Sequence, residues 1–153
     1  MAKRNKYLWL LSIPVLLIIL RKGMPKKAGY ITKNFTWDEF QSNDGAVMPN
    51  DVAENIKELA KNLQVIRDHV KQSIKINSAY RSPEWNKKVG GVSDSQHVKC
   101  KASDIVISGL TPTQVVKILE ELIASGKIKQ GGIGLYPNFV HYDIRGTKAR
   151  WKA

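Results

Sequence analysis

The sequence predicts an α+β fold: a single domain with helices packed on a small antiparallel sheet, preceded by an N-terminal hydrophobic anchor helix. Three observations support this prediction. The chain has 153 residues, which is room for one domain. Two stretches carry apolar residues at helical spacing, and several short segments with strand-like patterns lie between and after them. An uncharged apolar run lies near the N-terminus.

The apolar run covers residues 7–20, with basic residues on both sides. A helix of this length spans about 21 Å, less than the roughly 30 Å of a bilayer core, but snorkelling Lys and Arg side chains can rescue a short span. We expect residues 1–21 to be an uncleaved membrane anchor and 22–33 a linker, so the domain covers 34–153. A cleaved or released signal and a buried core helix stay open as alternatives. Because both flanks are basic, the positive-inside rule does not give the orientation.

Three helices are predicted in the domain. Thr36 and Glu39 fit a capping box, so a short helix should follow Thr36. A long amphipathic helix should run from Pro49 to about Lys71. Its apolar stripe consists of Val52, Ile56, Leu59, Leu63, Ile66 and Val70. A further helix should open at Thr111-Pro112 and reach about Ala124, before Gly126 ends it.

Four strands are predicted, at residues 75–78, 102–107, 132–135 and 139–145. The last two should be joined by a turn at Tyr136-Pro137-Asn138. Residues 81–95 contain Gly, Ser and Pro, with Gly90-Gly91 at a turn, and are expected to form a loop.

The net charge of +12 is concentrated near the N-terminus. Residues 1–34 hold eight Lys and Arg and no acid, and the remaining 17 basic residues face 13 acidic ones. Because no basic cluster lies on the predicted folded part, we expect no nucleic-acid partner. The single cysteine, Cys100, excludes an intramolecular disulfide and a cysteine-based zinc finger. Any metal site must therefore use histidines and carboxylates.

The last predicted strand carries polar residues on one face. Period-two alternation puts Phe139, His141, Asp143 and Arg145 on that face and apolar residues on the other. A face with His, Asp and Arg together is too polar for the core, so it should line a cleft. A solvated sheet face is the alternative.

His97 and Asp104 lie seven residues apart, and both side chains can bind metal. Two ligands of one tetrahedral zinc ion lie about 3.3 Å apart, whereas a strand or a helix would separate these residues by about 20 or 10 Å. The chain must therefore turn back at residues 98–101 for them to share an ion. His141 would complete three ligands and leave a fourth position open, as in catalytic zinc sites.

Ser95-Gln-His97-Val-Lys-Cys100-Lys-Ala-Ser-Asp104 resembles the S-x-H-x-x-G-x-A-x-D signature of the M15 zinc peptidases. That family includes D-Ala-D-Ala carboxypeptidases and phage L-alanyl-D-glutamate endopeptidases. The segments around Tyr80-Arg81, Asn86 and Gly90-Gly91, and residues 132–145, are similar to the same family. The resemblance runs from about Phe35 to Trp151 and is strongest to the compact subfamily found in phages and bacterial envelope proteins.

The resemblance implies a Zn²⁺ cofactor held by His97, Asp104 and His141. It implies that Arg81 stabilises the oxyanion that develops on the substrate carbonyl, and that Ser95, Arg81 and Tyr80 contact the substrate. The alternatives are a surface ion pair for Arg81 and a simple turn residue for Ser95. His69 matches no motif and is expected to be a partly exposed residue of the long helix.

Two departures from the family pattern bear on the chemistry. Cys100 stands where the signature has glycine, so a positive φ there would strain the turn. A thiol near the metal could bind it, but we expect Cys100 simply to pack. Asn138 stands where many relatives carry the acid that serves as general base. Asp143 is the predicted substitute, able to reach the attacking water, and a role in orienting a ligand is the rival interpretation.

The sequence therefore favours a zinc peptidase that hydrolyses a bond in peptidoglycan stem peptides or cross-links. It would be anchored in a membrane through residues 7–20, with its domain facing the periplasm or cell wall. A catalytically inactive zinc-bound module for wall binding or a virion is one alternative, and a cytosolic hydrolase of unrelated peptides is another. The bond cleaved, the bacterial or phage origin and the oligomeric state stay open.

Overall fold

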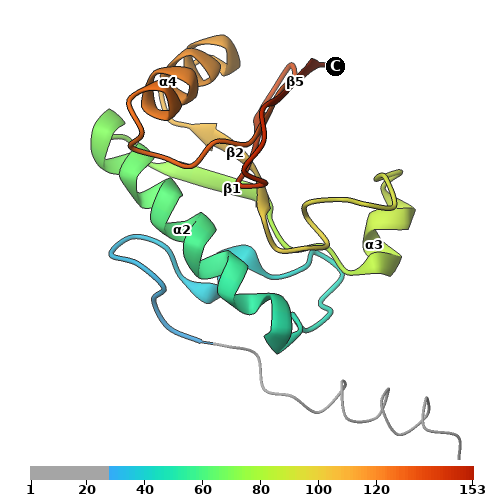
Figure 1. The fold of residues 1–153 in the computed structure, drawn as a ribbon. Helices are drawn as coiled ribbons and strands as arrows, with labels where there is room; N and C mark the ends of the chain where they lie inside the picture. Colours follow the sequence, from blue (N-terminus) through green and yellow to red (C-terminus); the bar gives the residue numbers. More distant parts are fainter. Residues whose placement is uncertain (1–27) are drawn as a thin grey trace, which may run out of the picture.

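The computed structural model describes residues 28–153, which form one α+β domain around a five-stranded sheet (Figure 1). The strand order in the sheet is β1-β2-β4-β3-β5. The strands are β1 (Ile74–Ser78), β2 (Ala102–Ile107), β3 (Gly132–Leu135), β4 (Val140–Asp143) and β5 (Ala149–Lys152). The four predicted strands are thus present, with β2 between β1 and β4 and β4 at the centre of the sheet.

The sheet is mixed, so the prediction of an antiparallel sheet is wrong for one pair of strands. Three of the four pairs are antiparallel, but β5 pairs parallel to β3. The topology gives the reason. β3 and β4 form an antiparallel hairpin, so at the end of β4 the chain is back at the end of the sheet where β3 begins. A strand that starts there and pairs with the free edge of β3 therefore runs parallel to β3. β5 was not predicted, because ARWK has only four residues and two of them are charged.

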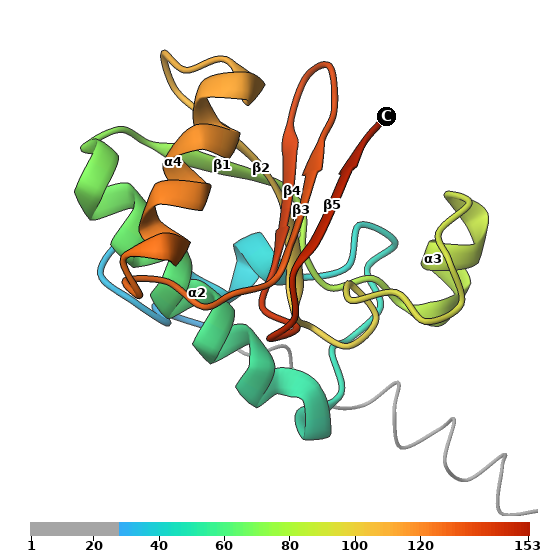
Figure 2. The same cartoon turned by 45° about the horizontal axis from the view of Figure 1, so that its top comes forward.

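Two helices pack on one side of the sheet, α2 (Asn50–Val70) and α4 (Pro112–Ala124) (Figures 1 and 2). Both were predicted. Each buries an apolar stripe, which includes Leu63 in α2 and Leu119 in α4. Val140 and Tyr142 of β4 are fully buried in the same hydrophobic core. The other side of β4 is left for polar residues.

A third helix, α3 (Pro83–Lys88), lies apart from α2 and α4 (Figure 2). It falls within residues 81–95, so the prediction of a continuous loop there is wrong. Ser82 caps it, since its Oγ accepts a hydrogen bond of 3.0 Å from the backbone of Trp85, and Pro83 occupies the first turn. Ser82 at the N-cap and Pro83 at the first helical position are together a local signal for a helix start.

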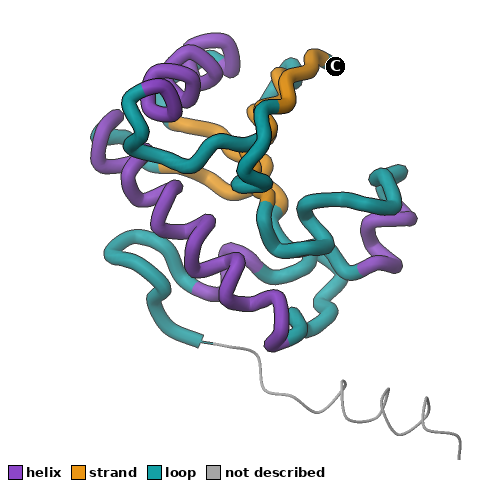
Figure 3. The backbone as a smooth tube through the Cα atoms, in the orientation of Figure 1, coloured by secondary structure: helices purple, strands orange, loops and turns teal. Residues whose placement is uncertain are grey.

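The N-terminal part of the domain begins with the short helix predicted after Thr36. It is a 3-10 helix, η1 (Trp37–Phe40), and the carboxylate of Glu39 accepts a 2.7 Å hydrogen bond from the backbone of Thr36. Figure 3 shows how much of the remaining backbone is loop, including the segment between η1 and α2. Trp37 and Phe40 are buried and fix this segment to the core.

The predicted membrane anchor, residues 1–21, lies outside the described residues. Of the predicted linker, residues 28–33 are described, and the hydroxyl of Thr32 donates a 2.9 Å hydrogen bond to Gln64 of α2. Within residues 28–153, no helix combines the length and the apolar character needed to cross a bilayer.

Candidate metal centre

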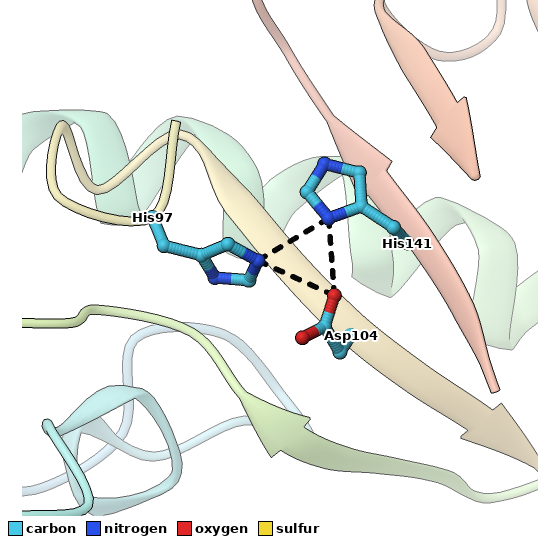
Figure 4. A group of neighbouring side chains, drawn as sticks. All are labelled: His97, Asp104 and His141. Atoms are coloured by element: carbon cyan, nitrogen blue, oxygen red, sulfur yellow. Dashed lines mark hydrogen bonds and ion pairs between the residues drawn. The ribbon is translucent and has the colours of Figure 1, made fainter. Parts of the chain in front are cut away.

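Three side chains from separate parts of the sequence meet on the polar side of the sheet: His97, Asp104 and His141 (Figure 4). His97 comes from the loop before β2, Asp104 lies on β2 and His141 lies on β4. The register of the β2–β4 pair places Asp104 directly opposite His141. Strand pairing therefore brings together two residues that are 37 positions apart.

The third residue reaches the pair because the chain turns back after His97. The backbone nitrogen of Cys100 donates to the carbonyl of His97 at 3.1 Å, and that of Lys101 donates to Gln96 at 2.9 Å. These bonds close the turn at residues 98–101 that the sequence spacing required. The turn needs a left-handed residue, and Cys100 has φ of +57°.

Cys100 packs and is not part of the three-residue cluster. Its side chain is fully buried in the hydrophobic core, and the cluster of metal-binding groups among residues 28–153 contains only the two histidines and the aspartate. The left-handed conformation is uncommon for a residue with a Cβ and costs about 1–2 kcal/mol. Burial of the thiol in the core offsets part of that cost.

The donor atoms form a triangle of the size that one metal ion needs. The distances are 3.2 Å from His97 Nε2 to His141 Nδ1, 3.3 Å from His97 Nε2 to Asp104 Oδ1, and 3.0 Å from His141 Nδ1 to Asp104 Oδ1 (Figure 4). Ligands about 2.0–2.1 Å from a tetrahedral zinc ion lie about 3.3 Å apart. Two imidazole nitrogens and one carboxylate oxygen are also a donor set that zinc accepts. The residues present therefore fit a zinc ion with one position left open.

The second nitrogen of each histidine has its own partner. His97 Nδ1 lies 2.7 Å from the carbonyl oxygen of Ala79, so it carries the proton and donates. His141 Nε2 lies 3.0 Å from Asp143 Oδ2 and donates to that carboxylate. Both bonds leave the nitrogen that faces the triangle with a free lone pair, which is how metal-binding histidines are usually oriented.

The electrostatics of the cluster favour a charged aspartate. Burial alone would raise the pKa of Asp104, but its interactions with the adjacent His141 and His97 outweigh burial and hold that pKa well below its usual range. Burial lowers the pKa of His97, which favours the neutral imidazole that a metal requires. For His141, burial is outweighed by hydrogen bonds to Asp104 and Asp143, and the pKa is raised.

Arg81 lies beside the triangle. Its Nη2 donates to Asp104 Oδ2 at 2.6 Å and its Nε to the hydroxyl of Ser78 at 2.9 Å. One oxygen of Asp104 thus faces the histidines and the other is held by Arg81. The Arg81 side chain is only 18% exposed, so this pair differs from an ordinary surface ion pair.

Asp143 is completely buried behind His141. Besides His141, its carboxylate accepts hydrogen bonds from the backbone of Gly132 at 2.9 Å and from the Arg145 guanidinium at 2.6 Å. Burial raises its pKa, yet the bonds from His141 and Arg145 outweigh burial and hold the pKa well below its usual range. These contacts lie at the ring nitrogen remote from the triangle. They favour the ligand-orienting role over the predicted role as general base.

The remaining predicted residues have different surroundings. Ser95 lines the cleft described below, and its Oγ accepts a 3.3 Å hydrogen bond from the backbone of His97. Tyr80 belongs to the hydrophobic core and is only 4% exposed, so its predicted contact with substrate has no support in this geometry. His69 is exposed on α2, as expected, and Asn138 is exposed in the β3–β4 turn.

A cleft of about 470 Å³ lies over the triangle, and the three candidate ligands form part of its wall. The polar face predicted for residues 139–145 therefore does line a cleft, through Phe139, His141 and Arg145, while Asp143 is buried beneath it. The opposite rim is the loop from Val89 to Val92, which includes Gly90 and Gly91.

Trp151 of β5 is a cleft residue that the sequence analysis missed. Its ring lies 5.0 Å from the His141 ring, and its Nε1 donates to the hydroxyl of Tyr136 at 3.1 Å. A Cβ at Gly134 would lie 2.4 Å from the indole, so glycine is needed to seat it. The only feature of the sequence that could have indicated Trp151 as a cleft residue is a single tryptophan in a basic C-terminal segment.

The comparison with known proteins agrees with this geometry. The profile of the family described as Peptidase M15 matches residues 32–143, which include the whole candidate centre. No match was found among curated proteins. Since the match covers well over half of the chain, the chain belongs to the peptidase M15 family.

Proposed function

We propose that this protein is a zinc-dependent peptidase that hydrolyses a peptide bond in peptidoglycan stem peptides or cross-links. The observation that carries the proposal is the triangle of His97, Asp104 and His141, with all three sides between 3.0 and 3.3 Å and open to a cleft. Membership of the peptidase M15 family supports the reaction class.

The three candidate ligands would hold the zinc ion, which when bound supplies Lewis-acid chemistry for activating water and polarising a carbonyl. Arg81 is placed to stabilise negative charge next to it. Two of its nitrogens are engaged by Ser78 and Asp104, while Nη1 has no partner among residues 28–153. The guanidinium is therefore held in one orientation with a donor left for the substrate oxygen.

Asp143 is proposed to act through His141. Its carboxylate holds the imidazole in the tautomer that presents Nδ1 to the metal position, and Arg145 and Gly132 hold the carboxylate in turn. Such a partner raises the basicity of the histidine ligand and fixes the ring. The competing role as general base predicts a different response to Asp143→Asn, as set out in the Discussion.

The proposed location is a bacterial or virion membrane, with residues 7–20 as the anchor and the domain facing the periplasm or cell wall. The support is the uncharged run itself and the substrate proposed. Protease added to spheroplasts that express the full chain should digest the domain. Complete protection of the domain would contradict this location.

The function is tested by incubating the zinc-loaded full chain with purified cell walls and measuring soluble peptides. We expect release, complete loss on chelation, and recovery when zinc is restored. His97→Ala should abolish release, whereas His69→Ala is the matched control, because His69 is an exposed histidine on α2. Mass spectrometry of the products identifies the bond. No release by protein that demonstrably holds zinc would contradict the proposal.

An inactive wall-binding or virion module is the second candidate. Two observations favour it: the exposed Asn138 at the position where many relatives carry an acid, and the full engagement of Asp143 by its neighbours. This candidate predicts that the protein binds to walls without turnover and that Asp143→Asn leaves the binding unchanged.

A further inference from the structure

Arg145 is held rigidly at one side of the cleft. Its Nε and Nη2 both donate to the carboxylate of Asp143, at 2.8 and 2.6 Å, and that carboxylate is completely buried. The pair fits closely against β3: a Cβ at Gly132 would lie 2.3 Å from Asp143 Oδ2 and 3.0 Å from Arg145 Nη2. The guanidinium therefore has one orientation before any substrate arrives.

The outer edge of the same guanidinium is available to a ligand. Nη1 has no hydrogen-bond partner among residues 28–153, the side chain is 31% exposed, and Arg145 lines the cleft together with the three candidate metal ligands. Its Cζ lies 5.9 Å from the centre of the Trp151 ring, which is itself 5.0 Å from the His141 ring. A group bound at Nη1 would thus lie near Trp151, whose ring also lies beside His141.

No acid of the described cleft forms a hydrogen bond with this edge. Asp104 is engaged by Arg81 and both histidines. Asp94, which also lines the cleft, pairs with Lys99 at 2.5 Å, and its charge acts on Arg145 without a hydrogen bond. A fixed guanidinium with unused N–H donors is well suited to a planar carboxylate, and the charge-assisted bond is stronger than a neutral one.

We propose that Arg145 is a specificity residue that binds a free carboxylate of the peptide substrate. The inference rests on the proposed function and adds to it the class of substrate. Arg145 is linked to the metal position by two hydrogen bonds, through Asp143 and His141. The carboxylate recognised therefore lies within about three residues of the cleaved bond, at about 3.5 Å per residue. A stem peptide whose diamino acid is lysine offers two candidates, the C-terminal carboxylate and the free carboxylate of its glutamate.

The test measures peptide binding by the zinc-free full chain, so that neither turnover nor a carboxylate–metal bond contributes. Three synthetic stem peptides are compared by calorimetry: one with both carboxylates free, one amidated at the C-terminus and one amidated at the glutamate. We expect one amidation to weaken binding about tenfold or more and the other to have little effect. The sensitive position identifies which carboxylate Arg145 binds.

Arg145→Gln should remove the difference between the free and the amidated peptide, so that both bind equally. Arg145→Lys, which keeps the charge but loses the planar fork, should retain a reduced preference and serves as the second variant if Arg145→Gln does not fold. Lys148→Gln is the matched control, since it removes one positive charge from an exposed position outside the cleft.

If Arg145 only supports Asp143, Arg145→Gln should weaken the binding of all three peptides by the same factor. That result would overturn the inference. A wild-type protein without preference, or a preference that survives in Arg145→Gln, would overturn it too. Wall cleavage by the zinc-loaded protein is a separate readout. If the protein cleaves walls but binds the free and amidated peptides equally, only this inference is overturned. If it prefers a free carboxylate but does not cleave walls, only the proposed function is overturned.

Discussion

The two faces of β4 are equally buried and chemically opposite. All four of its residues are buried, with Val140 and Tyr142 on the helix side and His141 and Asp143 on the cleft side. On the helix side the stabilisation comes from apolar area removed from water. On the cleft side, His141 Nε2 and both oxygens of Asp143 have hydrogen-bond partners, and His141 Nδ1 faces the metal position. Burial alone thus does not distinguish core residues from site residues. The two are distinguished by whether the buried side chain packs against apolar groups or forms hydrogen bonds.

This difference has an energetic consequence. A buried network of charged groups adds little net stability, because the desolvation of the charges offsets most of their attraction, yet removing one member leaves the others unpaired. We therefore expect substitutions on the helix side to lower folding stability and leave zinc affinity unchanged. Substitutions on the cleft side should lower zinc affinity, and they also cost stability where they leave a buried charge unpaired.

The largest effect on zinc affinity is expected for His141→Ala. A four-ligand structural zinc site is worth roughly 10–16 kcal/mol, so one ligand carries about 3 kcal/mol, which is more than a hundredfold in affinity. Competition with a chromophoric chelator measures the zinc dissociation constant. Tyr142→Phe is the control on the other face: it removes a 2.7 Å hydrogen bond to the carbonyl of Lys129 and should leave zinc affinity unchanged. Equal zinc affinity in the wild type and His141→Ala would refute the ligand assignment.

Leu119→Ala tests the helix side. Leu119 is fully buried in α4, which packs on β3 and β4. A truncation of this kind costs about 2–5 kcal/mol, which urea unfolding of the zinc-free protein measures. The zinc affinity of the remaining folded protein should be that of the wild type. A large loss of affinity at low urea would mean that the two faces are coupled, contrary to the comparison.

Asp143→Asn tests the cleft side of β4 at the residue for which two roles are proposed, orienting His141 or acting as general base. If Asp143 orients His141, the zinc affinity should fall about 10- to 100-fold, because the carboxylate that holds the ligand ring is lost. Chelator competition measures this, and activity is then assayed at saturating zinc. A general base would show the opposite pattern, with normal zinc affinity and a reduced turnover number.

The smallest effect is expected for Cys100→Ala. Alanine meets the same strain at φ of +57°, and only the buried thiol is lost, so the cost should be about 1 kcal/mol. Zinc affinity should not change, because Cys100 is outside the ligand cluster. A tenfold or larger loss of zinc affinity in this variant would show that the thiol contributes to the centre.

The parts of the fold that sequence patterns predicted are those with strong local signals. The apolar stripes of α2 and α4 and the alternation in β4 are periodic enough to define both the element and its buried face. The missed elements, α3 and β5, have six and four residues, too few for an apolar period to identify a helix or a strand. β5 exists because the edge of β3 pairs with it, which is a tertiary effect.

The features of the candidate site also fall into those that the sequence predicted and those that depend on tertiary contacts. The residue types and the H-x6-D spacing predicted a three-ligand centre, a reversing turn and a polar cleft face, and the structure brings these features together. The residues that orient or enclose the centre were less predictable. Trp151 reaches it only through the parallel β3–β5 pair, and the orientation of Asp143 behind the His141 ring depends on Arg145 and Gly132.

By itself, the sequence determined which atoms can bind a metal and that residues 98–101 must turn for His97 and Asp104 to share it. Both follow from local chemistry and chain length. Only the tertiary structure decided that Asp104 faces His141, that Asp143 supports this histidine from behind, and that the guanidinium edge of Arg145 is left open to the cleft. Those features depend on strand register and on contacts between distant residues, which no local pattern specifies.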